Sequence, residues 1–379
     1  MSWRAYISAL LKHLLYYIIY RQTEYAIYLG NYFLVFRLVD GLGCLCSCRH
    51  NMHNFIPESR FFPYLTWTEI QSMPDKENIV IIQPLGAIEQ HGPHLPLIVD
   101  AAISQAVTGK ALAKLDANIP AYALPTLYYG KSNEHCHFPG TIMLSAQTLL
   151  AVIGEIADSI YRAGFRKLVL MNAHGGQPQV MEIAARDIHQ KYQDFSVFPL
   201  FVWRVPNVAA ELLTAKELEF GIHAGDAETS LMLSILPDQV KMELAVTEYP
   251  KNLPIDSLLS MEGNLPFAWL TRELTESGVL GDATVATKEK GSRILESLSD
   301  GWVQVIKDVH KYRQPGSSAA DSLDGCNGCN GCNGCQEQGR RKREEYRCGN
   351  AVTRIVAAIK NVLTVLAVAI KIKNTVLEA

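Results

Sequence analysis

The chain has 379 residues, of which 48% are hydrophobic and 19% charged, and its formal net charge is −3. This hydrophobic content excludes a chain that is disordered along its whole length, because it is enough to build a sizeable core. The near balance of charge excludes a strongly basic surface for nucleic acid, so a small molecule is the expected partner.

Residues 1–55 form an apolar N-terminal extension. Charged residues such as Arg4, Lys12 and Arg21 interrupt it, so no apolar window reaches the roughly 20 residues that cross a membrane. It has no small-residue cleavage site typical of a signal peptide. We interpret it as an extension outside the functional domain, with a membrane-associated helix as the alternative.

Short β-branched runs alternate with helical patterns between residues 61 and 313. Strands are predicted at 78–82, 121–127, 167–171 and 195–203, and helices at 100–115, at 145–162 and from 178 onward. Ser145 is predicted to cap the second helix and Gly164 to end it. This alternation predicts an α/β domain whose mainly parallel sheet is covered by helices on both faces, with ligands beyond the carboxyl ends of the strands.

The C-terminal part has a different composition. Residues 316–348 contain the repeat GCNGCNGCNGC and a charged run, and residues 349–379 show the pattern of an amphipathic helix. The C-x-x-C spacing suits thiolate binding of a metal, but tandem repeats of this kind are low-complexity sequence, so we predict a disordered linker. The helix is predicted to be loosely attached, with contact to a membrane or a partner as the alternative.

Cysteines are concentrated outside the central region. Of the nine, only Cys136 lies between residues 61 and 313. Such a core does not depend on disulfide bonds, which is typical of proteins in a reducing cytosol. We therefore expect a cytoplasmic protein.

The stretch GAIEQHGPHLPLIVD, residues 86–100, concentrates possible metal ligands in one loop. Glu89 and His91 follow a predicted strand, and prolines and glycines keep this segment out of regular structure. Asp100 begins the next helix, where a carboxylate is favoured as an N-cap whatever its other roles. Together with Glu89 and His91, a ligand role is favoured, because carboxylate and imidazole suit Zn, Mn or Fe. His94 is predicted to shape the loop or support a ligand.

Two further stretches place polar residues at the same edge of the predicted sheet. In NAHGGQ, His174 lies between a buried strand and two glycines; the alternatives are a hydrogen-bonded core histidine and a metal ligand, and we favour the ligand. In HAGDAETS, Glu228 is either a first-turn helix carboxylate or a ligand. His223, five residues earlier, is the candidate proton carrier.

The loop GKSNEHCHFPGT follows the strand predicted at 121–127. Glu134, His135 and His137 are expected either to line the substrate pocket or to support the metal ligands. Cys136 offers a thiol nucleophile as a minor alternative. The residues assigned to the substrate pocket are Ser132, Glu134, His135 and Trp203.

Four motifs in the same order resemble the creatininase family, also called creatinine amidohydrolases: GAIEQHGPHLPLIVD, SNEHCHFPGT, NAHGGQ and HAGDAETS. SGVLGDATVAT at residues 277–287 is similar to the family's late loop, and the resemblance covers residues 61–313. It implies a three-layer α/β/α domain, often a hexamer, with a two-metal site at the strand ends. The implied metal ligands, with Asp100 as the bridge, are Glu89, His91, Asp100, His174 and Glu228.

The resemblance also assigns the chemistry. His223 takes the place of the acid–base histidine, and Glu228 belongs to both the catalytic set and the metal shell. Creatininase proper has a glutamate where this chain has Gly176, so Glu228 is expected to complete the shell of the second metal. Near His223 the sequence offers only Phe220 and Trp203 as an aromatic wall, which argues against creatinine in particular.

The expected function is that of an amidohydrolase that depends on two divalent ions, Zn, Mn or Fe. The ions would activate a water and polarise an amide carbonyl, and His223 would pass the proton to the departing nitrogen. The expected substrate is a small cyclic amide or a formamide, and the expected assembly is a homo-oligomer. The alternatives are a metallopeptidase of the same fold and a metal-containing scaffold without turnover.

Overall fold

The computed structural model describes residues 54–251, 253 and 257–315, and the backbone of three strands nearer the N-terminus. These strands are β1 (Glu24–Leu29), β2 (Tyr32–Arg37) and β3 (Cys44–Ser47), which pair as an antiparallel sheet. The backbone of these stretches is therefore strand and not helix, and the rest of residues 1–53 lies outside the described residues. The repeat at 316–348 and the helix predicted at 349–379 lie outside the described residues.

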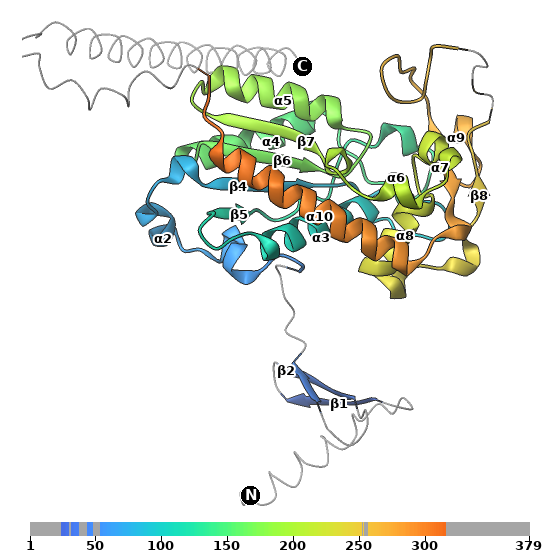
Figure 1. Ribbon diagram of the computed structural model, residues 1–379, viewed down its shortest axis with the longest axis horizontal. Helices are drawn as coiled ribbons and strands as arrows, with labels where there is room; N and C mark the ends of the chain where they lie inside the picture. Colours follow the sequence, from blue (N-terminus) through green and yellow to red (C-terminus); the bar gives the residue numbers. More distant parts are fainter. Residues whose placement is uncertain are drawn as a thin grey trace, which may run out of the picture. The chain divides into compact units, whose positions relative to one another are not determined.

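A parallel sheet of four strands forms the centre of the domain (Figure 1). The strand order is β5 (Ala121–Ala123), β4 (Val80–Leu85), β6 (Lys167–Asn172) and β7 (Ser196–Phe201). Val80 pairs with both Ala121 and Lys167, and Lys167 pairs with Ser196. All four strands therefore begin at one edge of the sheet, and their carboxyl ends meet at the other.

Helices cover both faces of this sheet, as Figure 1 shows for α5 on one side and for α3 and α10 on the other. Val80 and Ile82 belong to the core built with α3 (Val99–Lys114), α8 (Asp226–Ile235) and α10 (Lys288–Lys311). Ile81 and Leu168 belong to the core built with α4 (Ala146–Arg162) and α5 (Pro178–Lys191). Successive strand side chains point to opposite faces, so each strand serves both cores. The three-layer α/β/α prediction is confirmed.

Local signals placed several boundaries correctly. Ser145 Oγ accepts the Thr148 N–H at 3.1 Å and caps α4, and Gly164 follows its end with φ +103°. Two strands are shorter than predicted. The first, β5, was predicted to reach residue 127 but ends before Pro125, because proline has no N–H for the ladder. Leu127 still forms an isolated bridge with Leu85.

The strand predicted at 195–203 ends at Phe201, because a 3₁₀ turn, Val202–Arg204, takes its last residues. Trp203 therefore lies in that turn, beyond the end of β7. At the other side of the sheet a short helix, α2 (Trp67–Ser72), precedes β4 and is capped by Thr66 through a capping box. The strand order thus places three motifs at the carboxyl edge: GAIEQHGPHLPLIVD after β4, SNEHCHFPGT after β5 and NAHGGQ at the end of β6.

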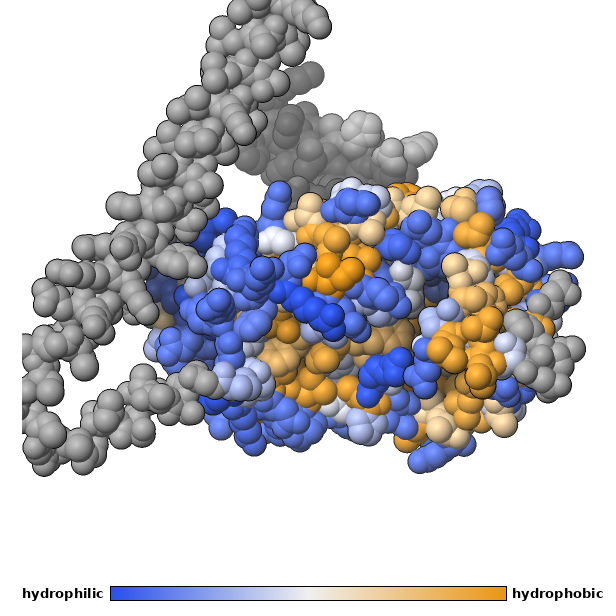
Figure 2. All heavy atoms as spheres, turned by 90° about the horizontal axis from the view of Figure 1, so that it is seen from above, coloured by the Kyte–Doolittle hydropathy of each residue, from blue (hydrophilic) through white to orange (hydrophobic). Residues whose placement is uncertain are grey.

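Short elements beyond the carboxyl ends of the strands close this end of the domain (Figure 1). They are α6 (Ala209–Leu212), α7 (Ala215–Phe220), β8 (Thr247–Glu248), α9 (Thr271–Leu274) and β9 (Gly281–Asp282). Met261, Leu274 and Leu280 form a small apolar cluster there. Figure 2 shows apolar side chains at the surface of this end as well. Leu258 is 85% exposed. Within the described part of the chain, no helix combines the length and apolarity needed to cross a membrane.

Candidate metal centre and its cavity

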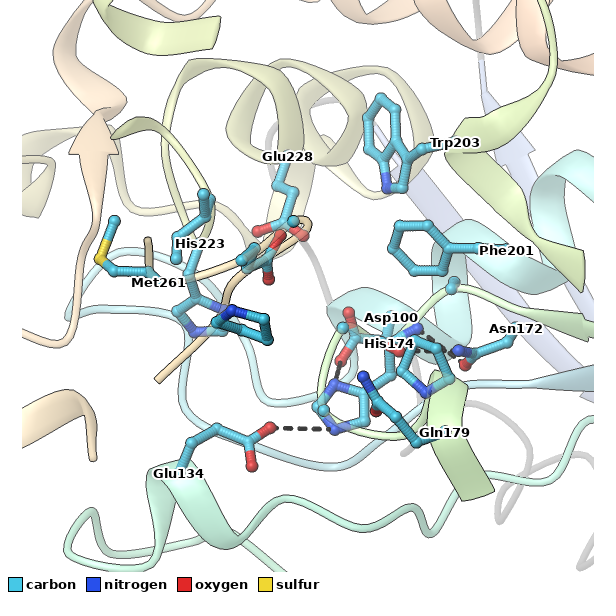
Figure 3. A pocket seen from close by; sticks show the side chains of 18 of the residues that line it. Asp100, Glu134, Asn172, His174, Gln179, Phe201, Trp203, His223, Glu228 and Met261 are labelled. Carbon is cyan, nitrogen blue, oxygen red and sulfur yellow. Dashed lines mark hydrogen bonds and ion pairs between the residues drawn. The ribbon is translucent and has the colours of Figure 1, made fainter. Parts of the chain in front are cut away.

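A cavity of about 1210 Å³ opens at the carboxyl edge of the sheet. Figure 3 shows the side chains of Asp100, His174, His223 and Glu228 directed into it. Aromatic and sulfur-containing side chains form another part of its wall: Phe201, Trp203, Met261, Phe267 and Trp269. Ionisable side chains therefore line one part of the cavity, and apolar side chains line another.

The loop after β4 brings Glu89 and Asp100 to the same place. Gly86 lies against the start of α3, where a Cβ would come within 2.4 Å of the Ala101 nitrogen, so only glycine allows this close approach. Glu89 N–H donates to the Leu97 carbonyl at 3.0 Å and closes the loop. The N-cap interpretation of Asp100 is wrong: Ile98 is the N-cap, and Asp100 lies in the first turn. Its carboxylate is therefore available to the cavity.

Asp100 stands between two groups of possible ligands. In the first group, His174 Nδ1 lies 3.3 Å from Glu89 Oε2 and 3.6 Å from Asp100 Oδ2. In the second, His91 Nε2 lies 3.6 Å from Asp100 Oδ1 and 3.8 Å from Glu228 Oε2. Each oxygen of Asp100 thus serves one group, which is the arrangement of a bridging carboxylate.

Three buried atoms at this point have no hydrogen-bond partner among the described residues: Glu89 Oε2, His91 Nε2 and Asp100 Oδ2. A buried polar atom without a partner costs roughly 1–3 kcal/mol, so such atoms are rare unless a ligand satisfies them. Carboxylate oxygens and imidazole nitrogens are donors that Zn and Mn accept. The residues present therefore fit a divalent metal centre.

The hydrogen bonds of the two histidines leave the inner ring nitrogens for a metal. His91 Nδ1–H donates to the Glu89 carbonyl at 3.1 Å, and His174 Nε2–H donates to the Lys131 carbonyl at 2.8 Å. A carbonyl only accepts, so in each neutral ring the lone pair is on the nitrogen that faces the carboxylates.

The carboxylates also hold protons on these rings when no metal competes. Burial disfavours the charged form of His91, but Asp100 and Glu228 outweigh it and raise the pKa to about 9. Burial opposes the charge of His174 as well, and Glu89 and Asp100 raise its pKa to about 10. Because metal binding needs the neutral rings, it must release these protons.

Glu228 supports the turn that carries His223. Its Oε2 accepts the Ala224 N–H at 2.7 Å, and Ala224 adopts φ +54°, which is uncommon for a residue other than glycine. Glu228 is therefore both a first-turn carboxylate and a member of the second ligand group. Burial, together with the charge of Asp100, raises its pKa to about 7 despite the opposing effect of His91.

His223 presents an unprotonated nitrogen to the cluster. Its Nε2–H donates to the Gln90 carbonyl at 2.7 Å, so the lone pair is on Nδ1, which lies 3.9 Å from Glu89 Oε1. Burial and the neighbouring His91 lower the pKa of His223 well below its ordinary value. The ring is therefore neutral, with its Nδ1 lone pair towards the cluster.

The residues predicted for the substrate pocket divide into two groups. Glu134, His135 and Trp203 line the cavity. Ser132 does not line it: it is buried behind His174, with its hydroxyl 3.3 Å from Nε2. Cys136, the minor candidate for a thiol nucleophile, is exposed and does not line the cavity either. His137 is exposed too and does not line this cavity.

Glu134 occupies the space that a side chain at position 176 would need. A Cβ at Gly176 would come within 1.8 Å of Glu134 Oε1, and that oxygen lies 3.4 Å from His174 Nε2 (Figure 3). The absence of a side chain at Gly176 therefore admits a carboxylate from another loop.

Sequence reasoning missed part of the site. Phe201, Phe267 and Trp269 add to the aromatic wall, which is therefore more extensive than the two aromatics considered from the sequence. Gln90 was also missed, although it lies between two predicted ligands, and its amide contacts both His135 and His223. His94 supports α8, since its Nε2 lies 2.8 Å from the Thr229 hydroxyl.

Comparison with known proteins identifies the family. The model of the creatininase family, described as creatinine amidohydrolase, matches residues 63–306. Creatinine amidohydrolase of Pseudomonas putida is 31% identical over 265 residues, which cover 66% of this chain and 97% of that protein. The mycofactocin precursor peptide peptidase of Mycolicibacterium smegmatis is 31% identical over 230 residues, 60% of this chain and 84% of that one.

Solved structures agree with these matches. A crystal structure of creatinine amidohydrolase superposes with a TM-score of 0.57 and 29% identity, and covers 67% of this chain and 99% of that one. The matched region contains all four motifs and the whole candidate metal centre. The chain belongs to the creatininase family.

Proposed function

We propose that this protein is a metal-dependent amidohydrolase with two divalent ions, one held by Glu89, Asp100 and His174 and the other by His91, Asp100 and Glu228. The observation that carries the proposal is that three buried ligand atoms, without a hydrogen-bond partner among the described residues, converge beside a large cavity. Solved creatininase structures described as Mn and as Zn-Zn forms support zinc or manganese as the ions.

The ions would supply Lewis acidity and an activated water beside the cavity. His223 can accept a proton at Nδ1 and return it to the departing nitrogen of an amide. The orientation of the ring does not change when Nδ1 gains or loses a proton, because Nε2–H stays hydrogen-bonded to the Gln90 carbonyl. The proposal therefore keeps His223 and Glu228 as the catalytic residues.

Two substrate classes are compatible with this site. A small cyclic amide or a formamide would follow the creatinine amidohydrolase relative. The cavity of about 1210 Å³ exceeds the roughly 300–1,000 Å³ of ordinary small-molecule sites, which favours a larger amide such as a peptide. The peptidase relative, 31% identical, supports this second candidate.

One experiment tests both candidates. Purified protein is loaded with Zn²⁺ or Mn²⁺, its metal content is measured, and ammonia, formate or amino-group release is followed with cyclic amides, formamides and short peptides. We expect about two ions per chain and turnover of at least one class, and His223→Ala should lower turnover by about 10²–10⁴-fold with metal retained. Bound metal without hydrolysis of any candidate would support the scaffold alternative instead.

A further inference from the structure

We infer that His135 and Gln90 are positioning residues of the metal centre: the Gln90 amide fixes the tautomer of His135, whose Nε2–H then orients Glu89. This inference rests on the proposed function, because it concerns how a ligand is held. It adds two residues that belong to neither of the two proposed ligand groups.

The orientation of the Gln90 amide is determined by its surroundings. Its Oε1 accepts the Gly92 N–H at 2.9 Å, so the NH₂ group lies at the other end. That group donates to the Gly278 carbonyl at 3.1 Å and approaches His135 Nδ1 at 2.8 Å. The nearby His223 Nε2, 3.1 Å away, already carries a hydrogen for the Gln90 carbonyl and cannot accept another.

Gln90 therefore decides the tautomer of His135. The Thr271 hydroxyl also lies 2.9 Å from His135 Nδ1, but it can donate to the Glu134 carbonyl, 2.9 Å away, and accept from Nδ1. Thr271 alone would permit a proton on either ring nitrogen. The amide N–H of Gln90 permits only an acceptor at Nδ1, so the proton of the neutral ring must be on Nε2.

This proton selects the oxygen of Glu89 that remains available. His135 Nε2 lies 3.3 Å from Glu89 Oε1, while Glu89 Oε2 has no hydrogen-bond partner among the described residues and faces His174 Nδ1. The Glu89 side chain is 1% exposed, so water cannot replace the histidine as a donor without a rearrangement. Groups that orient a ligand in this way typically contribute 10–100-fold to metal affinity.

Gly278 offers a way to disturb the amide without touching either histidine. It adopts φ +87°, and a Cβ there would lie 2.0 Å from Gln90 Oε1. Gly278→Ala should therefore displace the amide and have the same effect on metal affinity as removing it.

The test measures Zn²⁺ affinity by competition with a chromophoric chelator, and urea unfolding of the metal-free protein. His135→Ala should weaken zinc binding by about 10–100-fold and Gln90→Met or Gly278→Ala by about tenfold. His135→Gln should stay within about threefold of the wild type, because its amide can place an N–H near the former Nε2. His137→Ala, an exposed histidine on the same loop, is the matched control and should change nothing.

A second measurement reports the tautomer directly. In ¹⁵N spectra of histidine-labelled, metal-free protein, Gln90→Met should move part of the His135 proton from Nε2 to Nδ1. Unchanged affinity in His135→Ala and Gln90→Met would overturn the inference. Equal losses in His135→Gln and His135→Ala, in step with their unfolding midpoints, would indicate a merely structural role and also overturn it. A wild-type protein without zinc affinity would instead contradict the proposed function, and this inference with it.

Discussion

At the scale of single residues, each of three ligand side chains in the candidate metal centre uses its two polar atoms for different partners. Asp100 offers one oxygen to each ligand group, and His91 and His174 each donate one N–H to a carbonyl and keep the other nitrogen for the cluster. The hydrogen bond to the carbonyl restricts the rotation of each ring, so the ligand nitrogens are held in position before an ion binds.

Because each oxygen of Asp100 faces a different ligand group, substitutions in the two groups should remove different numbers of ions. Asp100→Ala should remove both ions, because it removes a ligand from each group, whereas Glu228→Ala should remove only the ion next to His91. Metal analysis after gel filtration should give about zero and about one ion per chain, respectively. Asp238→Ala changes an exposed carboxylate and is the control. Loss of both ions in Glu228→Ala would contradict two separate groups.

At the scale of elements, the buried carboxylate of Glu217 joins three segments near the site. It accepts the Asp226 N–H at the start of α8 at 2.7 Å, the Asp282 N–H in β9 at 3.0 Å and the Tyr249 hydroxyl at 3.1 Å. Gly225 lies against it without a side chain, since a Cβ there would come within 2.1 Å of Oε1. The start of α8, which carries Glu228, is therefore held to α7 and β9.

Glu217→Gln should lower the free energy of unfolding by about 1–3 kcal/mol, because an amide NH₂ would face an N–H that now has an acceptor. Urea unfolding of the metal-free protein measures this change. Glu219→Gln, an exposed carboxylate on the same helix, should leave the free energy of unfolding within about 0.5 kcal/mol. Equal stability of both variants would show that the Glu217 contacts are dispensable.

The carboxylate of Glu248 holds the start of the loop at residues 277–287 through hydrogen bonds that depend on its ionisation. It accepts from the Ser277 N–H at 2.9 Å, the Ser277 hydroxyl at 2.6 Å and the Glu276 N–H at 3.1 Å. Burial opposes ionisation, but these hydrogen bonds and Lys251 outweigh it and lower the pKa to about 2 from the ordinary 4.5. A lowered pKa means that the folded state favours the ionised form.

The stabilisation from Glu248 should be fully present above pH 4.5 and disappear as the pH falls through about 2. Unfolding free energies of metal-free wild type and Glu248→Gln should therefore differ at pH 6, and the difference should shrink below pH 4.5 and vanish towards pH 2. Glu243→Gln, an exposed residue nearby, serves as the comparison. A difference that grows as the pH falls would have the wrong sign and would refute this role of Glu248.

At the scale of the whole molecule, the sheet explains why the site lies where it does. Parallel strands end at one edge, and the loops after β4, β6 and β7 meet there under the short elements that follow. Three leucines near this end are exposed, Leu258, Leu259 and Leu265, which is more apolar surface than one loop normally presents to water.

The homo-oligomer, a hexamer by family resemblance, stays a prediction. If the exposed leucines contribute to its interfaces, light scattering should give a mass several times the 42.1 kDa of one chain, and Leu258→Ser with Leu265→Ser should reduce it. Trp67→Ser, an exposed aromatic in α2, provides a comparison substitution on a different element. A monomer at micromolar concentration would contradict the prediction.

The sequence by itself determined the local structure and the chemistry of the ligands. Ser145 and Gly164 mark the ends of α4, the β-branched runs specify the strands, and the loop after β4 supplies Glu89, His91 and Asp100 within twelve residues, since these signals depend on near neighbours in the chain.

Only the tertiary structure decided how distant segments complete the site. The Gln90 amide reaches Gly278 across 188 residues and His135 across 45, and the cavity gains Phe267 and Trp269 from a segment with no regular pattern. Such contacts depend on the packing of whole elements, because neither residue of a pair carries a local signal of its partner. For the same physical reason, Glu134 could be placed over Gly176 only from the folded chain.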